Sequence, residues 1–264
     1  MPAGERNNVS HEPVVDSLYG EFADEYDDRH GTVGVRGMPD IPFYSRLALE
    51  AGGAVVELGV GTGRVAIPSV LAGARVLGID LSSRMLAIAR RKAVAQRVER
   101  ELGLVLGDMR RFALTRPAAL VTIPFRAFLH NLTTDDQLAT LASCRAALRP
   151  GGRLALNIFN PDLAMIADWM KLSPEDRVRP DALVADAWES CDYDPSRQRI
   201  DSVVRMRGPD GERRIAFRTR WVYRFEMQHL LERSGFEVET LHGDFEGTAF
   251  DVSSPEMVWV ARAV

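Results

Sequence analysis

The chain has 264 residues, of which 46% are hydrophobic, and a formal net charge of −4. This length is enough for one hydrophobic core with an insertion but hardly for two large domains. The negative net charge, with basic residues spread among acidic ones, argues against a nucleic-acid substrate. Cys144 and Cys191 lie far apart without a C-x-x-C or histidine-rich neighbourhood, so neither a disulfide framework nor a bound metal is predicted.

Residues 1–11 are polar and contain no apolar run. Elsewhere no segment approaches the ~18 consecutive apolar residues of a membrane-spanning helix. We therefore expect a soluble, cytoplasmic protein that does not contact a membrane. The sequence leaves the oligomeric state open, and a homodimer is one alternative.

Residues 1–50 are predicted to form an N-terminal helical lid. Tyr19 and Tyr26 lie in a segment that fits either packing of an amphipathic helix or contact with a ligand. A glycine-rich loop follows at 31–37, and a loop of this composition is able to close over a bound ligand. A further helix is expected to be capped by Asp40, with Pro42 in its first turn.

The most informative segment is 55–63, Val-Val-Glu-Leu-Gly-Val-Gly-Thr-Gly, in which an apolar strand runs directly into three glycines. Glycine lacks a Cβ and reaches positive φ, so this loop exposes its backbone amides to a small molecule at the start of the next helix. The following strand ends in Asp80, a carboxylate that suits the two hydroxyls of a ribose. The pattern therefore predicts a ligand that contains a nucleoside.

The spacing of these glycines argues against a dinucleotide. Dinucleotide-binding loops follow G-x-G-x-x-G, whereas Arg64 occupies the final glycine position here. Glu57, two residues before the first glycine, suits an ammonium group better than a pyrophosphate. Burying this carboxylate without a partner would cost several kcal/mol, which favours a ligand beside it. NAD stays an alternative only because Asp80 would hold its ribose equally well.

Strands and helices alternate over 54–159, as expected for a parallel sheet that is covered on both faces. One helix is predicted from Ser82 through about Glu101. Another begins at Thr134 and ends before Pro150 and Gly151, and the fifth strand then covers 153–159.

Residues 161–224 fall outside this alternation and are predicted to form a β-rich substrate cap. Residues 200–207 and 213–223 alternate around a Gly-Pro-Asp-Gly turn, which indicates an antiparallel hairpin. Its second strand is expected to carry Ile215, Phe217, Trp221 and Tyr223 on one face and Arg214, Arg218 and Arg220 on the other. A helix at 225–233 and two apolar strands, 236–241 and 257–264, complete the chain.

Four motifs occur in the order that is typical of the class I S-adenosylmethionine (SAM)-dependent methyltransferases, which this sequence resembles. They are Glu57 to Gly63, Asp80 at the end of the second strand, Gly107-Asp108-Met109 after the third strand, and Leu148 to Gly152 before the fifth. The chain is most similar to the small-molecule subgroup that includes N-methyltransferases of nucleotide-linked amino sugars. The resemblance implies an α/β fold with a doubly wound, Rossmann-like, seven-stranded sheet, formed by 51–160 and 225–264, and an antiparallel β cap inserted at 161–224.

The resemblance also implies how the cofactor is bound. Glu57 and the amides of Gly59 and Gly61 would hold the methionine end of SAM, and Asp80 its ribose. Asp108 and the Met109 amide would hold the adenine. The residues expected to bind SAM are Tyr19, Tyr26, Glu57, Gly59, Gly61, Gly63, Asp80, Leu81, Asp108, Met109 and Ile123. Methyl transfer is an in-line displacement, so no metal is expected.

The methyl acceptor is expected beside the segment that follows the fourth strand. His130 is the one histidine of this segment, and an imidazole with a pKa of about 6.5 suits proton removal from a hydroxyl or an ammonium group. A structural or helix-capping role is the competing interpretation. Phe125, Arg126, Arg218 and Arg220 are candidate acceptor contacts, because guanidinium groups bind phosphate. A solvated strand face is the alternative for these arginines.

The fourth strand is not followed by (D/N)-P-P-(Y/F), the signature of related enzymes that methylate nucleic-acid bases and protein glutamine. The leading hypothesis is therefore a SAM-dependent methyltransferase that acts on O or N of a small metabolite, with secondary metabolism as one setting, and releases S-adenosylhomocysteine (SAH). The alternatives are a catalytically silent SAM-binding partner subunit and an NAD-linked oxidoreductase.

Overall fold

A computed structural model describes residues 26–27, 39–173, 176–180, 187–208 and 211–264. Most of the predicted N-terminal lid, including Tyr19 and the glycine-rich loop at 31–37, lies outside the described residues. Tyr26 and Asp27 are the part of that region, before the helix α3, whose contacts are known.

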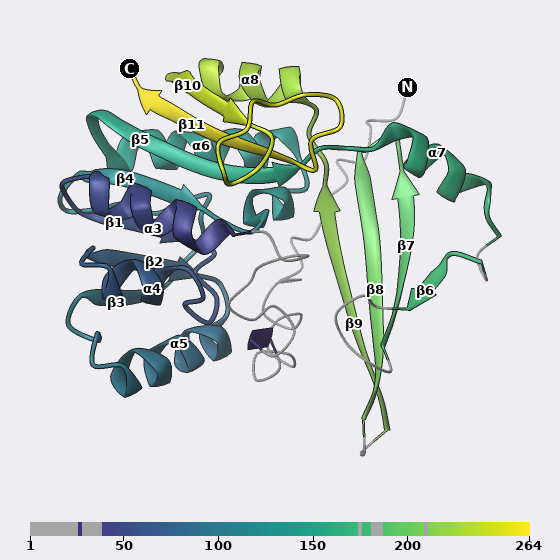
Figure 1. Ribbon diagram of the computed structural model, residues 1–264, viewed down its shortest axis with the longest axis horizontal. Helices are drawn as coiled ribbons and strands as arrows, with labels where there is room; N and C mark the ends of the chain where they lie inside the picture. Colours follow the sequence, from purple (N-terminus) through teal and green to yellow (C-terminus); the bar gives the residue numbers. More distant parts are fainter. Residues whose placement is uncertain (1–25, 28–38, 174–175, 181–186, 209–210) are drawn as a thin grey trace, which may run out of the picture.

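The centre of the molecule is a seven-stranded sheet with the order β10-β11-β5-β4-β1-β2-β3 (Figure 1). Its strands are β1 (Val55–Leu58), β2 (Val76–Asp80), β3 (Leu102–Leu106), β4 (Ala118–Ile123), β5 (Leu148–Phe159), β10 (Phe236–His242) and β11 (Glu256–Ala263). The first five run parallel, and β11 is antiparallel to both of its neighbours. The predicted doubly wound, seven-stranded fold is confirmed.

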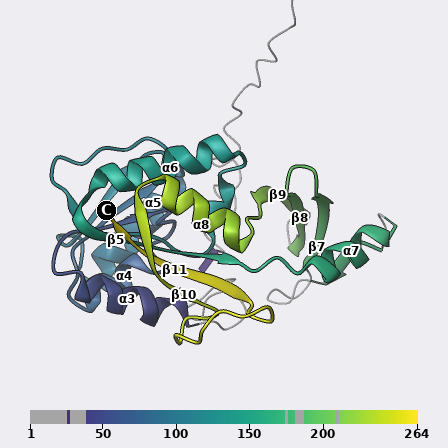
Figure 2. The same ribbon diagram turned by 90° about the horizontal axis from the view of Figure 1, so that it is seen from above.

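Helices cover both faces of this sheet, with α3 and α4 on one face and α6 and α8 on the other (Figure 2). Their bounds are α3 (Asp40–Glu50), α4 (Ala66–Leu71), α5 (Ser83–Ala95), the 3₁₀ helix η2 (Ala127–His130), α6 (Thr134–Ala147) and α8 (Arg224–Arg233). All four residues of β1 are buried, because alternate side chains enter two separate cores. This burial places the end of β1 in the middle of the molecule.

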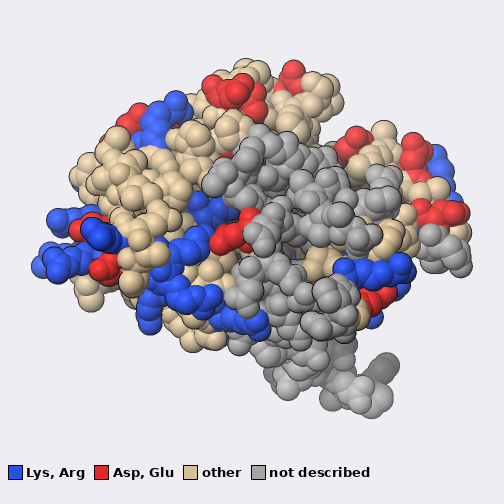
Figure 3. All heavy atoms as spheres, turned by 60° about the horizontal axis from the view of Figure 1, so that its bottom comes forward, with Lys and Arg blue, Asp and Glu red and all other residues tan. Residues whose placement is uncertain are grey.

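Two helices differ from the sequence prediction at their ends. α5 is capped by Ser82 as expected, but it ends at Ala95 because Arg97 adopts a left-handed φ of 59°. Asp40 does not cap α3; it is the first helical residue and directs its carboxylate to Arg64 instead. The basic residues Arg84 and Arg90 of α5 are exposed. Figure 3 shows basic side chains gathered toward the lower left of the molecule.

Between β5 and α8 the chain forms the predicted antiparallel insertion, which stands beside the main sheet (Figure 1). It contains α7 (Leu163–Lys171), β6 (Val178–Pro180), β7 (Ala187–Asp194), β8 (Arg199–Gly208) and β9 (Gly211–Arg220), and its four strands follow one another in sheet order. The hairpin forms with Gly208 opposite Gly211. Its second strand ends at Arg220, earlier than expected, because Trp221 and Val222 pack into the interior on the way to α8.

No helix within the described residues is long and apolar enough to cross a membrane. In the same part of the chain no three histidine, cysteine, aspartate or glutamate side chains are grouped as they would be around a metal ion. Cys144 and Cys191 form no disulfide bond within the described residues.

Candidate cofactor and acceptor site

The glycine loop after β1 has a backbone that residues with side chains rarely adopt. Gly59, Gly61 and Gly63 have φ values of +69°, +53° and +79°. A Cβ on Gly59 would lie 2.9 Å from the Cβ of Ala127, whereas a Cβ on Gly61 would meet nothing within 4 Å. The loop is therefore packed against η2 at its start and open at Gly61, which leaves room for a ligand against the backbone.

Asp80 lies at the tip of β2 beside this loop. Its Oδ2 accepts a hydrogen bond from the Gly61 amide at 2.8 Å, and its Oδ1 accepts one from the Ser82 amide at 2.8 Å. These bonds fix the carboxylate at the carboxyl edge of the sheet, where ligands of open α/β sheets bind. A carboxylate at this position suits the hydroxyl groups of a ribose. Leu81 follows it, half-buried at the same edge.

Glu57 lies in the buried strand β1 at 4% exposure. Burial raises the pKa of its carboxyl to about 8, although the positive charge of Arg64 and a backbone hydrogen bond at Ala66 act in the opposite direction. Glu57 is therefore largely protonated near neutral pH unless a further positive group approaches it. An ammonium group of a ligand would be such a group.

Arg64 forms a buried ion pair that the sequence did not predict. Its two terminal nitrogens donate to the two carboxylate oxygens of Asp40 at 2.9 and 2.5 Å. The guanidinium carbon also lies 4.4 Å from the ring centroid of Phe125. Arg64 thus joins the glycine loop to α3 and to the segment that follows β4. The signal in the sequence was an arginine at the position where a dinucleotide loop has glycine.

Tyr26 and Asp27 contact the same region. The Tyr26 ring meets Phe125 edge-on at 6.3 Å between centroids, and burial raises the pKa of its hydroxyl far above the ordinary value. Asp27 accepts hydrogen bonds from the Thr62 hydroxyl at 2.6 Å and from the Lys92 ammonium at 2.7 Å. Tyr26, a predicted cofactor contact, therefore lies next to the glycine loop.

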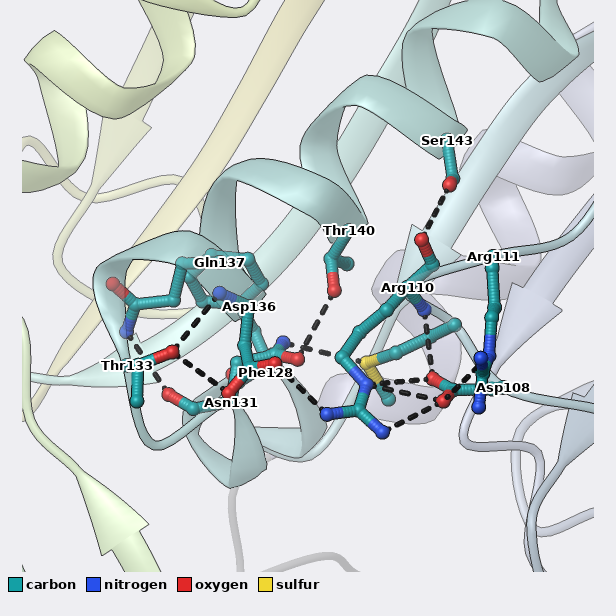
Figure 4. A network of polar contacts seen from close by, with 11 residues as sticks. Asp108, Arg110, Arg111, Phe128, Asn131, Thr133, Asp136, Gln137, Thr140 and Ser143 are labelled. Carbon is teal, nitrogen blue, oxygen red and sulfur yellow. Dashed lines mark hydrogen bonds and ion pairs between the residues drawn. The ribbon is translucent and has the colours of Figure 1, made fainter. Parts of the chain in front are cut away.

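Asp108 and Met109 follow β3. Figure 4 shows the Asp108 carboxylate between the side chains of Arg110 and Arg111. The Arg110 guanidinium donates to both Asp108 oxygens at distances between 2.7 and 3.1 Å, and to Asp136 of α6 at 2.8 Å. Burial alone would raise the pKa of Asp108, but the hydrogen bonds and charges of Arg110 and Arg111 outweigh it and lower the pKa. Asp108 is therefore ionised and held in one orientation.

The segment after β4 has two consecutive left-handed residues, Phe125 and Arg126, with φ values of 56° and 63°. This conformation is costly for residues other than glycine and is common at functional sites. Arg126 holds the turn in place through an ion pair with Glu256, a carboxylate with no exposed surface. Ile123, the last residue of β4, is also fully buried.

His130 ends η2 and faces the cap strand β9. Its Nδ1 lies 3.2 Å from the carbonyl oxygen of Arg218. Because a carbonyl only accepts, Nδ1 must carry the proton and Nε2 the lone pair. Burial lowers the pKa of this imidazole, against the smaller opposing effect of the Arg218 carbonyl. The lowered pKa favours the neutral imidazole at pH 7.

The arginines predicted to meet an anionic acceptor have different surroundings. Arg220 is 8% exposed and donates to Gln137 at 3.0 Å and to Glu226 at 2.6 Å. Arg126 is paired with Glu256. These two guanidinium groups are paired with carboxylates of the protein, and their contact with an anionic acceptor stays a prediction. The Arg218 side chain is nearly half exposed, and its Nε lies 3.5 Å from Oδ1 of Asp201.

The comparisons with known proteins agree with this geometry. A family model described as a methyltransferase domain matches residues 55–152. The solved structure of the CcbJ methyltransferase from Streptomyces caelestis is 29% identical, covers 94% of this chain and 98% of that chain, and has a TM-score of 0.80. Residues 55–152 thus match a methyltransferase domain, and the chain as a whole is similar to class I SAM-dependent methyltransferases. This similarity favours SAM as the methyl donor over the NAD-linked alternative.

Two further relatives match nearly the whole methyltransferase chain. The cypemycin N-terminal methyltransferase of Streptomyces sp. is 25% identical over 246 residues, which are 92% of this chain and 97% of that protein. CalS10 from Micromonospora echinaspora, an amino pentose methyltransferase, is 20% identical, with a TM-score of 0.62 over 92% of this chain and 97% of that chain. At 20% identity, the likeness to CalS10 concerns the fold alone.

Proposed function

We propose that this methyltransferase transfers the methyl group of SAM to a nitrogen or oxygen atom of a small-molecule acceptor. The observation that carries the proposal is the open backbone at Gly61 with Asp80 bonded beside it, at the carboxyl edge of the sheet. One relative supports the acceptor class, since it is an N-terminal methyltransferase of cypemycin. The acceptor class proposed here is accordingly an amine or hydroxyl compound such as an amino sugar.

The residues present fit SAM in three places. Glu57 would meet the ammonium group, Asp80 the ribose hydroxyls, and Asp108 with the Met109 amide the adenine. Bound there, SAM supplies a methyl group on a positively charged sulfur, which needs only alignment and exclusion of water. The lid at 1–50 and the cap at 161–224 would provide that exclusion, around a catalytic domain formed by 51–160 and 225–264.

His130 would remove the proton from the acceptor. Its neutral ring, with the proton on Nδ1 held by the Arg218 carbonyl, presents Nε2 as a base. Phe125 and Arg218, whose side chain is nearly half exposed, are further proposed acceptor contacts. A structural histidine with no proton to move is the competing account, and it is the one that a silent SAM-binding subunit would need.

Titration calorimetry with SAH tests the cofactor site. The protein is expected to bind one SAH per chain, and Asp80→Ala to weaken binding by about 100-fold because charged hydrogen bonds to the ribose are lost. Asp168→Ala removes an exposed carboxylate of α7 and should leave the affinity unchanged. A folded protein without SAH binding would exclude the proposal. SAH formation from SAM in the presence of amino sugars or phenolic metabolites would then separate an enzyme from a silent subunit.

Glu57 gives a second expectation, on proton release. Because the pKa of Glu57 is about 8 in the free protein, and a ligand ammonium would lower it, SAH binding at pH 7 should release about one proton. The release should fade above pH 8, where Glu57 is already ionised. Calorimetric enthalpies measured in phosphate and in Tris buffer report the proton count. Equal enthalpies in the two buffers would contradict this role, and Glu57→Gln should abolish the difference.

A further inference from the structure

A buried polar network around Asn131 connects η2, the segment after β3 and α6 (Figure 4). Asn131, which follows His130 in the chain, lies at the centre of this network and is 4% exposed. The side-chain Nδ2 donates to the Phe128 carbonyl at 3.0 Å and to the Met109 sulfur at 3.5 Å. Its Oδ1 accepts from the Thr140 hydroxyl of α6 at 3.0 Å. One amide thus joins three separate segments of the chain.

The backbone of Asn131 extends the network to the cap. Its carbonyl accepts from the Gln137 side-chain nitrogen at 3.3 Å. Gln137 is completely buried, and its oxygen accepts from Arg220 at 3.0 Å, at the end of β9. Two residues earlier on β9, the Arg218 carbonyl accepts from the His130 ring. His130 is therefore held from its covalent neighbour and from the cap strand at once.

The same residues reach the glycine loop on the other side. An added Cβ on Gly59 would lie 2.9 Å from Ala127 of η2 and 3.9 Å from the terminal methyl of Met109. Protein interiors are close-packed, so a displacement of one residue is transmitted to the residues that contact it. A shift of η2 would therefore move Met109 and the loop together.

We propose, on the basis of the function proposed above, that Asn131 is a positioning residue that sets the His130 ring and the cofactor-side residue Met109 in one common arrangement. Removing a buried amide leaves its former partners without hydrogen bonds, so the local structure must rearrange. The arrangement makes cofactor affinity and the environment of the imidazole depend on the same side chain.

Asn131→Leu, which keeps the size but removes the polar atoms, tests this inference. The SAH dissociation constant is expected to rise about tenfold. In the same variant the His130 imidazole, followed by nitrogen-15 NMR, should titrate closer to the ordinary histidine pKa because it loses its buried position. The chain has five histidines, and the spectrum of His130→Gln identifies the relevant signal. Thr140→Val should shift both readouts in the same direction by a smaller amount.

Cys144→Ala is the matched control, because Cys144 is buried in α6 one turn after Thr140 and contributes apolar packing alone. It should lower stability and leave both readouts unchanged. If Asn131→Leu does not fold, Thr140→Val decides by the same measurements. The inference would be overturned if, in a folded variant, neither the SAH dissociation constant nor the His130 pKa changed, or only one of them did. The wild type would still bind SAH in that case. Failure of the wild type to bind SAH would overturn the proposed function and this inference together.

Discussion

Replacement of Arg64 by methionine is expected to lower the free energy of unfolding by about 3–5 kcal/mol, because it leaves the buried Asp40 carboxylate without its counterion. The side chains of Arg64 and Asp40 are only 6% and 3% exposed, so water cannot replace the lost partner. The contact of the guanidinium with the Phe125 ring is lost as well. For a chain of this size the melting temperature should fall by on the order of 10 °C.

Two companion variants make this expectation specific to the buried charge. Asp40→Leu combined with Arg64→Met should recover much of the stability, because no unpaired charge is then left inside. Arg46→Met breaks the exposed Arg46–Glu50 pair on the same helix α3 and should change stability by less than about 1 kcal/mol. Equal melting temperatures for the Arg64 and Arg46 variants in a calorimetric scan would contradict the assigned role of Arg64.

The parts of the site that the sequence predicted well are those with local causes. A strand that ends in three glycines must turn at once, and the next strand must end beside it, so Gly61 and Asp80 could be brought together without a structure. The alternation of strands and helices predicted a covered parallel sheet, and the family resemblance carried by the ordered motifs implied its seven strands. The antiparallel hairpin followed from its turn residues.

The ion pairs that the sequence did not predict join charged side chains that are distant in the chain. Arg126 looked available to an anion, but its partner Glu256 is 130 residues away and reaches it only because β11 inserts next to β5. Asp40 looked like a helix cap because caps are recognised by position, whereas the arginine that binds it comes from another element. Charge type alone does not reveal such pairs, since it carries no information on which side chains the fold brings together.

The environment of His130 also depends on a residue that is distant in the chain. The carbonyl that fixes its tautomer comes from Arg218, 88 residues later, on the cap strand. The sequence could name His130 as a candidate base but could not say which ring nitrogen would carry the proton. The burial that lowers its pKa is likewise a property of the folded chain.

His130→Gln is accordingly expected to reduce turnover by about 10²–10⁴-fold while the affinity for SAH changes by less than about twofold. Glutamine keeps a hydrogen-bonding group near the acceptor but cannot take its proton. His229→Gln, an exposed histidine of α8 beside Glu232, is the matched control and should retain full turnover. The measurement is SAH formation with an acceptor found in the screen described above, together with SAH calorimetry.

The pH dependence separates a base from a residue that only packs. A base must be neutral to act, and burial lowers the pKa of His130 below the ordinary 6.5. Wild-type turnover should therefore rise with pH along an acidic limb whose midpoint lies below the ordinary histidine pKa of about 6.5, and then reach a plateau. In His130→Gln this acidic limb should vanish along with most of the rate. If His130→Gln lowers the rate but keeps the acidic limb, the limb belongs to another group and His130 only orients the acceptor. If turnover is unchanged, His130 has no part in the mechanism.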